Sequence, residues 1–154
     1  MSSLYDYIIV GAGSAGCALA ARLAWGRPKL RILVLEAGGP DKSFMLKMPA
    51  GFASLGENSP YNWHYSTTPQ KHCNNRQMYW PRGKTLGGSS SINAMLYIRG
   101  HAWDYDQWRQ LGNQGWSYED VLPYFKMAEN NERGADAFHG TGGPLNVADQ
   151  VDPS

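Results

Sequence analysis

The sequence predicts an α/β fold that begins with a βαβ unit, and three features of the first 36 residues support this prediction. Residues 7–10 form a short apolar run typical of a strand. Residues 11–16 carry glycines at the G-x-G-x-x-G spacing and lead into a helical apolar pattern that ends near residue 26. Residues 31–35 form a run that is continuously apolar after Arg31, as expected for a strand buried on both faces, and Glu36 follows them.

Each glycine of this turn has its own predicted role. Gly11 allows a tight turn, Gly13 lets the backbone approach a diphosphate with no Cβ in the way, and Gly16 allows the helix and strand to pack closely. The helix N-terminus adds unpaired N–H groups and the positive end of a dipole. A glycine turn that serves packing alone has the same spacing, so the rest of the chain must decide between the two interpretations.

An acidic residue at the end of the second strand strengthens the binding interpretation. In dinucleotide-binding proteins a carboxylate at this place accepts hydrogen bonds from the ribose hydroxyls. Glu36 is therefore a candidate ribose ligand. The alternative is an ordinary charge at a strand end.

The composition excludes several classes of function. The 14 Lys and Arg residues and 13 Asp and Glu residues leave a net charge of +1, so no overall field favours nucleic acid or an anionic membrane. No apolar run approaches the ~20 residues of a membrane span, and the first residues lack a signal-peptide pattern. Only two cysteines occur, and they form no C-x-x-C pair. We expect a soluble, cytoplasmic protein with no metal site and no nucleic-acid partner.

The middle of the chain is predicted to be largely loop. Residues 41–68 show no sustained period apart from a weak helical patch at 44–48. Trp63, His64 and Tyr65 could line a flat ligand, but a histidine between aromatic residues is more often a structural hydrogen-bonding group. Residues 77–80 are predicted to form a short strand.

A second glycine-rich segment, residues 82–100, has two adjacent glycines followed by three serines. It predicts another place where backbone N–H groups and hydroxyls converge on a polar or anionic ligand. It is not a P-loop, because no glycine lies at the required distance before Gly83-Lys84-Thr85.

The last third of the chain predicts short helices and one strand. A helix is expected over residues 104–111, and another starts at Ser117, whose spacing to Asp120 is that of a capping box. Pro123 is expected to divide the second pattern into a helix ending at residue 122 and another reaching about residue 130. Residues 145–147 are expected to form a strand.

Taken together, the two glycine segments resemble those of the glucose–methanol–choline (GMC) flavoprotein oxidoreductases. Residues 83–93 are similar to the first signature of that family, and residues 11–36 are similar to its ADP-binding βαβ unit. Residues 63–65, 115–117 and 122–125 also resemble bacterial alcohol and choline dehydrogenases.

This resemblance implies a Rossmann-like FAD-binding domain, with hydride transfer from the alcohol carbon of a small alcohol or choline-like substrate to FAD. The implied FAD-binding residues are Gly11, Gly13, Ser14, Ala15, Gly16, Glu36, Ala37, Ser89, Asn93, Ala94, Met95 and Leu96. Some family members attach FAD through a histidine just before the signature asparagine. Ile92 occupies that place here, so the resemblance implies non-covalent FAD.

Length is the largest departure from the family. There, a histidine near the C-terminus takes the alcohol proton, and none of the four histidines here matches it. We therefore expect no catalytic residue in residues 1–154, which correspond to the N-terminal portion of the FAD-binding domain, with 138–154 as the segment that could enter the substrate domain. The chain is expected to be a fragment, a truncated product or one piece of a split protein with a complementing C-terminal chain. Sheet edges and apolar faces should then be exposed.

Two other interpretations stay open. The chain could be a non-catalytic flavin-binding module that needs a partner chain. It could also be an NAD-dependent Rossmann enzyme, which the similarity at residues 87–93 disfavours.

Overall fold

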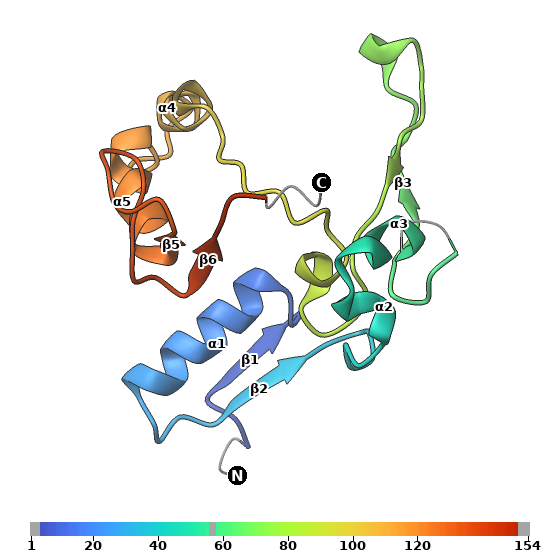
Figure 1. Ribbon diagram of the computed structural model, residues 1–154, viewed down its shortest axis with the longest axis horizontal. Helices are drawn as coiled ribbons and strands as arrows, with labels where there is room; N and C mark the ends of the chain where they lie inside the picture. The colour runs from blue at the N-terminus through green and yellow to red at the C-terminus, as the bar shows by residue number, and fades with distance from the viewer. Residues whose placement is uncertain (1–3, 56–57, 151–154) are drawn as a thin grey trace. The chain divides into compact units, whose positions relative to one another are not determined.

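The computed structural model describes residues 4–55 and 58–150, and the chain divides into two compact units at Leu96–Tyr97 (Figure 1). No helix within the described ranges is both long and apolar enough to cross a membrane. The elements in chain order are β1 (Tyr7–Val10), α1 (Ser14–Gly26), β2 (Ile32–Leu35), α2 (Phe44–Lys47), η1 (Pro49–Gly51), α3 (Phe52–Leu55), β3 (Tyr65–Ser66), η2 (Lys71–Cys73), β4 (Tyr79–Trp80), η3 (Gly88–Ser91), α4 (Ala102–Gln110), α5 (Tyr118–Ala128), β5 (Glu129–Asn131) and β6 (Leu145–Val147).

The first unit begins with the predicted βαβ arrangement. β1 pairs with β2 in parallel, with Tyr7 opposite Ile32 and Val10 opposite Leu35. Figure 1 shows α1 lying alongside these two strands. The helix starts directly after Gly13 and ends at Gly26. The α/β prediction is therefore confirmed.

The two-stranded sheet has little core. Ile9 is buried, but Ile8 and Val10 are 60% and 83% exposed. The expected burial of the second strand on both faces is wrong within the described residues, since Leu35 is 47% exposed and β2 pairs there with β1 alone. The expected exposure of apolar sheet residues is confirmed.

The loop after β2 contains more helix than the sequence indicated. The weak helical patch becomes α2, and two further short elements, η1 and α3, follow it directly. Four-residue helices are too short to display a 3.6-residue period, so the sequence pattern could not identify α3. Gly51 allows the close turn here, because a Cβ on it would lie 2.1 Å from the carbonyl oxygen of Met45.

His64 has structural contacts in the antiparallel β3–β4 hairpin. Its Nε2 lies 2.7 Å from the Ser59 carbonyl oxygen and its Nδ1 lies 3.2 Å from the Tyr79 hydroxyl. The buried Asn62 donates to the same hydroxyl over 2.7 Å. These contacts agree with the interpretation of His64 as a structural hydrogen-bonding group.

The second unit contains two capped helices. The backbone N–H of Asp120 donates to the Ser117 hydroxyl, and the Ser117 N–H donates to the Asp120 carboxylate, so the predicted capping box of α5 is confirmed. His101 caps α4 in the same way, accepting from the N–H of Trp103 while its own N–H donates to Asp104. Because histidine is not a common N-cap residue, the sequence placed the start of this helix two residues too late.

The predicted break at Pro123 is wrong. α5 runs without interruption through Pro123 and ends at Ala128. The helix stops there because the next residues, Glu129–Asn131, form β5 and pair in parallel with β6. Proline removes one helical hydrogen bond, but the capped N-terminus and aromatic packing hold the helix together. The Tyr105 ring lies 5.6 Å from the Phe125 ring and 6.1 Å from the Tyr118 ring.

A buried ion pair in the second unit joins Arg99, in the segment before α4, to Glu129, the first residue of β5. Glu129 is fully buried and accepts hydrogen bonds from the Arg99 guanidinium, the Gly140 N–H and the Asn131 amide. Burial opposes ionisation of this carboxylate, but the two hydrogen bonds from Asn131 and Gly140 and the charge of Arg99 together lower the pKa of Glu129. The sequence did not predict this pair, since its two residues lie 30 positions apart.

Candidate functional site

The glycine turn after β1 has the geometry that its sequence predicts. Gly11 has φ of +95°, a conformation that favours glycine, and its N–H donates to the Leu35 carbonyl oxygen over 2.7 Å. A Cβ on Gly16 would lie 1.9 Å from the Gly11 carbonyl oxygen and 3.4 Å from a methyl group of Ile9. The predicted packing role of Gly16 is therefore confirmed.

The N-terminus of α1 presents backbone donors. Its N-cap residue, Gly13, has no side chain to accept from the helix, and the first helical N–H that bonds to it belongs to Cys17. The N–H groups of Ser14, Ala15 and Gly16 precede that bond and have no acceptor inside the helix. Together with the helix dipole, they suit an anionic group such as a diphosphate.

The second glycine segment contacts this turn directly. The Gly87 N–H donates to the Ala12 carbonyl oxygen over 2.8 Å. Gly88 has φ of +57°, and a Cβ on it would lie 2.8 Å from the Gly13 Cα. The hydroxyls of Ser14 and Ser90 also share a hydrogen bond. Two stretches more than 70 residues apart thus form one surface around the start of α1.

Glu36 lies at the same turn. One of its carboxylate oxygens accepts from the Ala12 N–H over 2.8 Å, and the other accepts from the Gly38 N–H over 2.9 Å. Ala37, the next predicted site residue, is exposed. Because each carboxylate oxygen can accept more than one hydrogen bond, these contacts leave Glu36 with capacity for ribose hydroxyls.

The serines of the second segment have partners within the chain. The Ser89 hydroxyl accepts from the Gly83 N–H over 3.1 Å, and the Ser91 hydroxyl donates to the Leu86 carbonyl oxygen over 2.9 Å. These bonds hold η3 in its tight turn. The sequence predicts that these hydroxyls converge on a ligand. In the structure, the hydroxyls of Ser89 and Ser91 also stabilise the loop.

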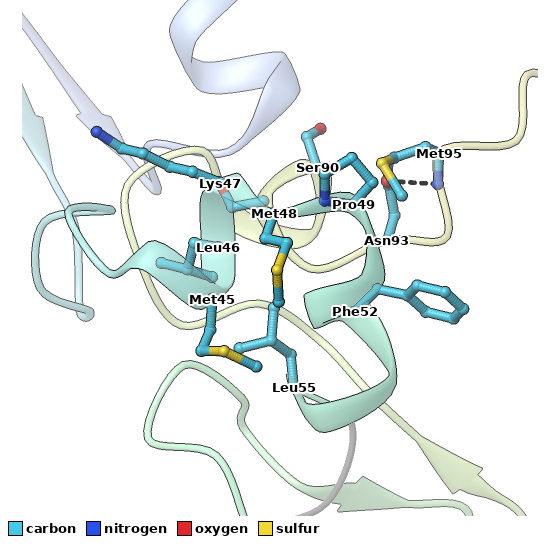
Figure 2. A pocket seen from close by; sticks show the side chains of 11 residues that line it. Met45, Leu46, Lys47, Met48, Pro49, Phe52, Leu55, Ser90, Asn93 and Met95 are labelled. Atoms are coloured by element: carbon cyan, nitrogen blue, oxygen red, sulfur yellow. Dashed lines mark hydrogen bonds between the residues drawn. The ribbon is translucent and has the colours of Figure 1, made fainter. Parts of the chain in front are cut away.

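A pocket of about 100 Å³ lies next to the second segment (Figure 2). Its apolar wall includes Met45, Met48 and Phe52, and its other wall includes Asn93 and Met95. The Met95 N–H donates to the Asn93 side-chain oxygen over 2.9 Å, which stabilises the left-handed backbone of Met95 at φ of +59°. The pocket therefore combines an apolar wall with a fixed polar edge.

The structure brings together most, but not all, of the predicted site residues. Ala94 and Leu96 lie outside the pocket lining, and Leu96 is 76% exposed. Sequence reasoning missed Met45, Met48 and Thr85, which contribute to the pocket or to the contact between the segments. A weak helical period was the only signal for the two methionines, and an interior position in the Gly/Ser-rich segment was the only signal for Thr85.

The parallel βαβ unit, the glycine turn at the helix N-terminus and the acid after β2 define a dinucleotide-binding α/β protein. A family model described as GMC oxidoreductase matches residues 5–154. The chain belongs to the GMC oxidoreductase family.

Curated relatives agree with this assignment. The chain is 51% identical over 150 residues to an alcohol dehydrogenase [acceptor] of Pseudomonas putida, an alignment that covers 97% of the chain and 27% of the relative. It is 53% identical over 142 residues to an oxygen-dependent choline dehydrogenase of Sinorhizobium fredii, covering 92% of the chain and 26% of the relative. The chain thus spans about a quarter of the length of these relatives.

Solved structures show the same fold. Pyridoxine 4-oxidase from Mesorbium loti matches with a TM-score of 0.82 and 40% identity, over 97% of this chain and 30% of that one. A formate oxidase matches with a TM-score of 0.78 and 32% identity, over 94% of this chain and 26% of that one.

Proposed function

We propose that this chain is the N-terminal, FAD-binding portion of a GMC-type oxidoreductase that acts on the CH–OH group of a small alcohol or choline-like substrate. The observation that carries this proposal is the contact between the two glycine segments at the N-terminus of α1, where a Cβ on Gly88 would lie 2.8 Å from the Gly13 Cα. The names of the relatives, alcohol dehydrogenase and choline dehydrogenase, support the substrate class.

The residues present suit FAD. The α1 N–H groups at Ser14 to Gly16 would hold the diphosphate, since they are donors at the positive end of a helix. Glu36 and Ala37 would lie at the adenosine ribose. Residues 89–96 would lie along the flavin, with Asn93 and Met95 at the edge of the pocket.

When bound, FAD would supply the hydride acceptor for alcohol oxidation. The part of this chain would be to bind and orient it, with backbone donors at the diphosphate and fixed dipoles near the flavin. We assign no catalytic acid or base to this chain. We also propose that residues 1–154 form the N-terminal portion of the FAD-binding domain, with 138–154 as the segment that could enter the substrate domain.

Titration of the purified 154-residue chain with FAD tests the proposal. We expect saturable binding, a yellow absorption band that stays with the protein through gel filtration, and release of all the FAD when the protein is denatured, because the binding is non-covalent. NAD in place of FAD serves as the control. Binding of NAD without binding of FAD would contradict the proposal and favour the NAD-dependent alternative.

Glu36→Ala is expected to weaken FAD binding by about 1.5–3 kcal/mol, the usual contribution of a hydrogen bond to a charged acceptor. The dissociation constant from the same titration measures the effect. Because Glu36 also accepts from Ala12 and Gly38, the melting temperature of the cofactor-free variant should be recorded alongside. Glu132→Ala, which removes an exposed acid from the second unit, is the control. Equal FAD affinity of wild type and Glu36→Ala would contradict a role for Glu36 in binding FAD.

A second candidate function is a flavin-binding module that depends on a partner chain. The exposure of Ile8 and Val10 on the two-stranded sheet favours it, because such surfaces are normally covered by further strands or helices. Alcohol oxidation with an artificial electron acceptor tests this second candidate. Turnover by the 154-residue chain alone would contradict the second candidate. Turnover only after addition of a complementing C-terminal chain would support it.

A further inference from the structure

Thr85 is a fully buried polar residue of the second glycine segment. Its Oγ1 donates to the Gly39 carbonyl oxygen over 2.9 Å, across a separation of 46 residues. Gly39 lies in the loop that leaves β2. Buried hydroxyls are kept where they have a partner, and this partner is a backbone atom of the loop after the second strand.

The residues after Thr85 contact both loops at the ends of the parallel strands. The Leu86 N–H donates to the same Gly39 oxygen over 3.0 Å, and the Gly87 N–H donates to the Ala12 carbonyl oxygen over 2.8 Å. Thr85 with Gly39 and Gly87 with Gly13 form parallel β-bridges. The segment therefore crosses the carboxyl ends of β1 and β2, which is the ligand-binding edge of open α/β sheets.

The crossing is tight at Gly38. A Cβ on Gly38 would lie 2.0 Å from the Lys84 carbonyl oxygen, so the backbones meet directly on the β2 side. A shift of residues 85–88 along the loop would move Gly88 and Ser90 away from Gly13 and Ser14. The Thr85 hydroxyl resists such a shift because it adds a directional bond to Gly39, which an apolar side chain of the same shape would lack.

We propose that Thr85 is a positioning residue for the FAD site: its hydroxyl fixes the register of residues 85–88 against Gly39 and so holds the second glycine segment against the N-terminus of α1. The inference rests on the proposed function. Thr85 acts through Gly87 and Gly88.

Thr85→Val and Thr85→Ser separate the hydroxyl from the shape of the side chain. We expect Thr85→Val to raise the dissociation constant for FAD about three- to tenfold, since one neutral hydrogen bond is lost. Its bound flavin should also show an altered visible circular dichroism spectrum. Thr85→Ser retains the hydroxyl and should restore both values. Thr67→Val is the matched control, because the Thr67 hydroxyl accepts from the Met78 N–H in the β3–β4 hairpin, away from the glycine segments.

Amide hydrogen exchange of the cofactor-free chain measures the stability of the residue 85–88 contacts without FAD. Thr85→Val should speed exchange at Leu86 and Gly87, whereas Thr67→Val should leave these two amides unchanged. Failure of the wild type to bind FAD would overturn the proposed function, and unchanged exchange at Leu86 and Gly87 in Thr85→Val would overturn the role of Thr85. Wild-type FAD affinity in Thr85→Val would also overturn it. If Thr85→Val does not fold, Thr85→Ser decides, because a loss of FAD affinity with the hydroxyl still present contradicts the proposal.

Discussion

Gly16→Ala is expected to abolish FAD binding and to destabilise the first unit by about 3 kcal/mol or more, the upper range for overpacking. The added Cβ would lie 1.9 Å from the Gly11 carbonyl oxygen, which belongs to the backbone and cannot rotate away. Gly11 itself is tied to β2 through its bond to Leu35. Relief of the clash would therefore move α1 away from the turn that it forms with β1.

The sign of this effect is the opposite of that expected from helix propensity. Alanine inside a helix is normally favoured over glycine by about 1 kcal/mol. Gly26→Ala is the matched control, because Gly26 lies in the same helix and a Cβ there has no atom within 4 Å. Urea unfolding and FAD titration measure both variants. If Gly16→Ala is as stable as Gly26→Ala and still binds FAD, the close contact inferred at the turn is wrong.

Arg99→Met is expected to lower the free energy of unfolding of the second unit by about 3 kcal/mol, the lower range for breaking a buried ion pair. Arg99 and Glu129 have side chains that are 12% and 0% exposed, so the Glu129 carboxylate would lose its cationic partner without access to water. The aliphatic Met side chain retains packing against Phe125, over which the guanidinium now lies at 5.2 Å. Urea unfolding at pH 7 gives the measurement.

The loss should depend on pH. The pKa of Glu129 is lowered in the folded protein, so its ionised form stabilises the fold above the ordinary glutamate pKa of about 4.3, and this contribution is lost as the pH falls through the lower, folded value. The difference between wild type and Arg99→Met should therefore be largest at neutral pH and shrink in acid. A difference that stays constant from pH 7 to pH 3 would show that charge is not its cause.

Arg133→Met provides the control for the ion pair. Arg133 pairs with Asp149, but these side chains are 72% and 57% exposed. Exposed pairs contribute about 0–1 kcal/mol, so this variant should remain close to wild type. The double variant Arg99→Met with Glu129→Gln should recover part of the stability, since it removes the uncompensated charge.

Local sequence patterns predicted much of the fold. The strands at β1 and β2, the helix between them and the capping box at Ser117 all depend on residues that are close in the chain. Errors arose where a local rule competed with packing. Pro123 lies inside a continuous helix because the aromatic contacts of Phe125 and the capped N-terminus outweigh one missing hydrogen bond.

In the candidate site, too, some features follow from the local sequence and others only from the tertiary structure. By itself the sequence determined the glycine turn, the acid at residue 36 and the family resemblance, because spacing and residue type carry these features. Only the tertiary structure decided that Gly88 meets Gly13, that Thr85 bonds to Gly39, and that Arg99 pairs with the buried Glu129. Each of these contacts joins residues 30 or more positions apart, and no local period or spacing records which distant backbone atoms will meet when the chain folds.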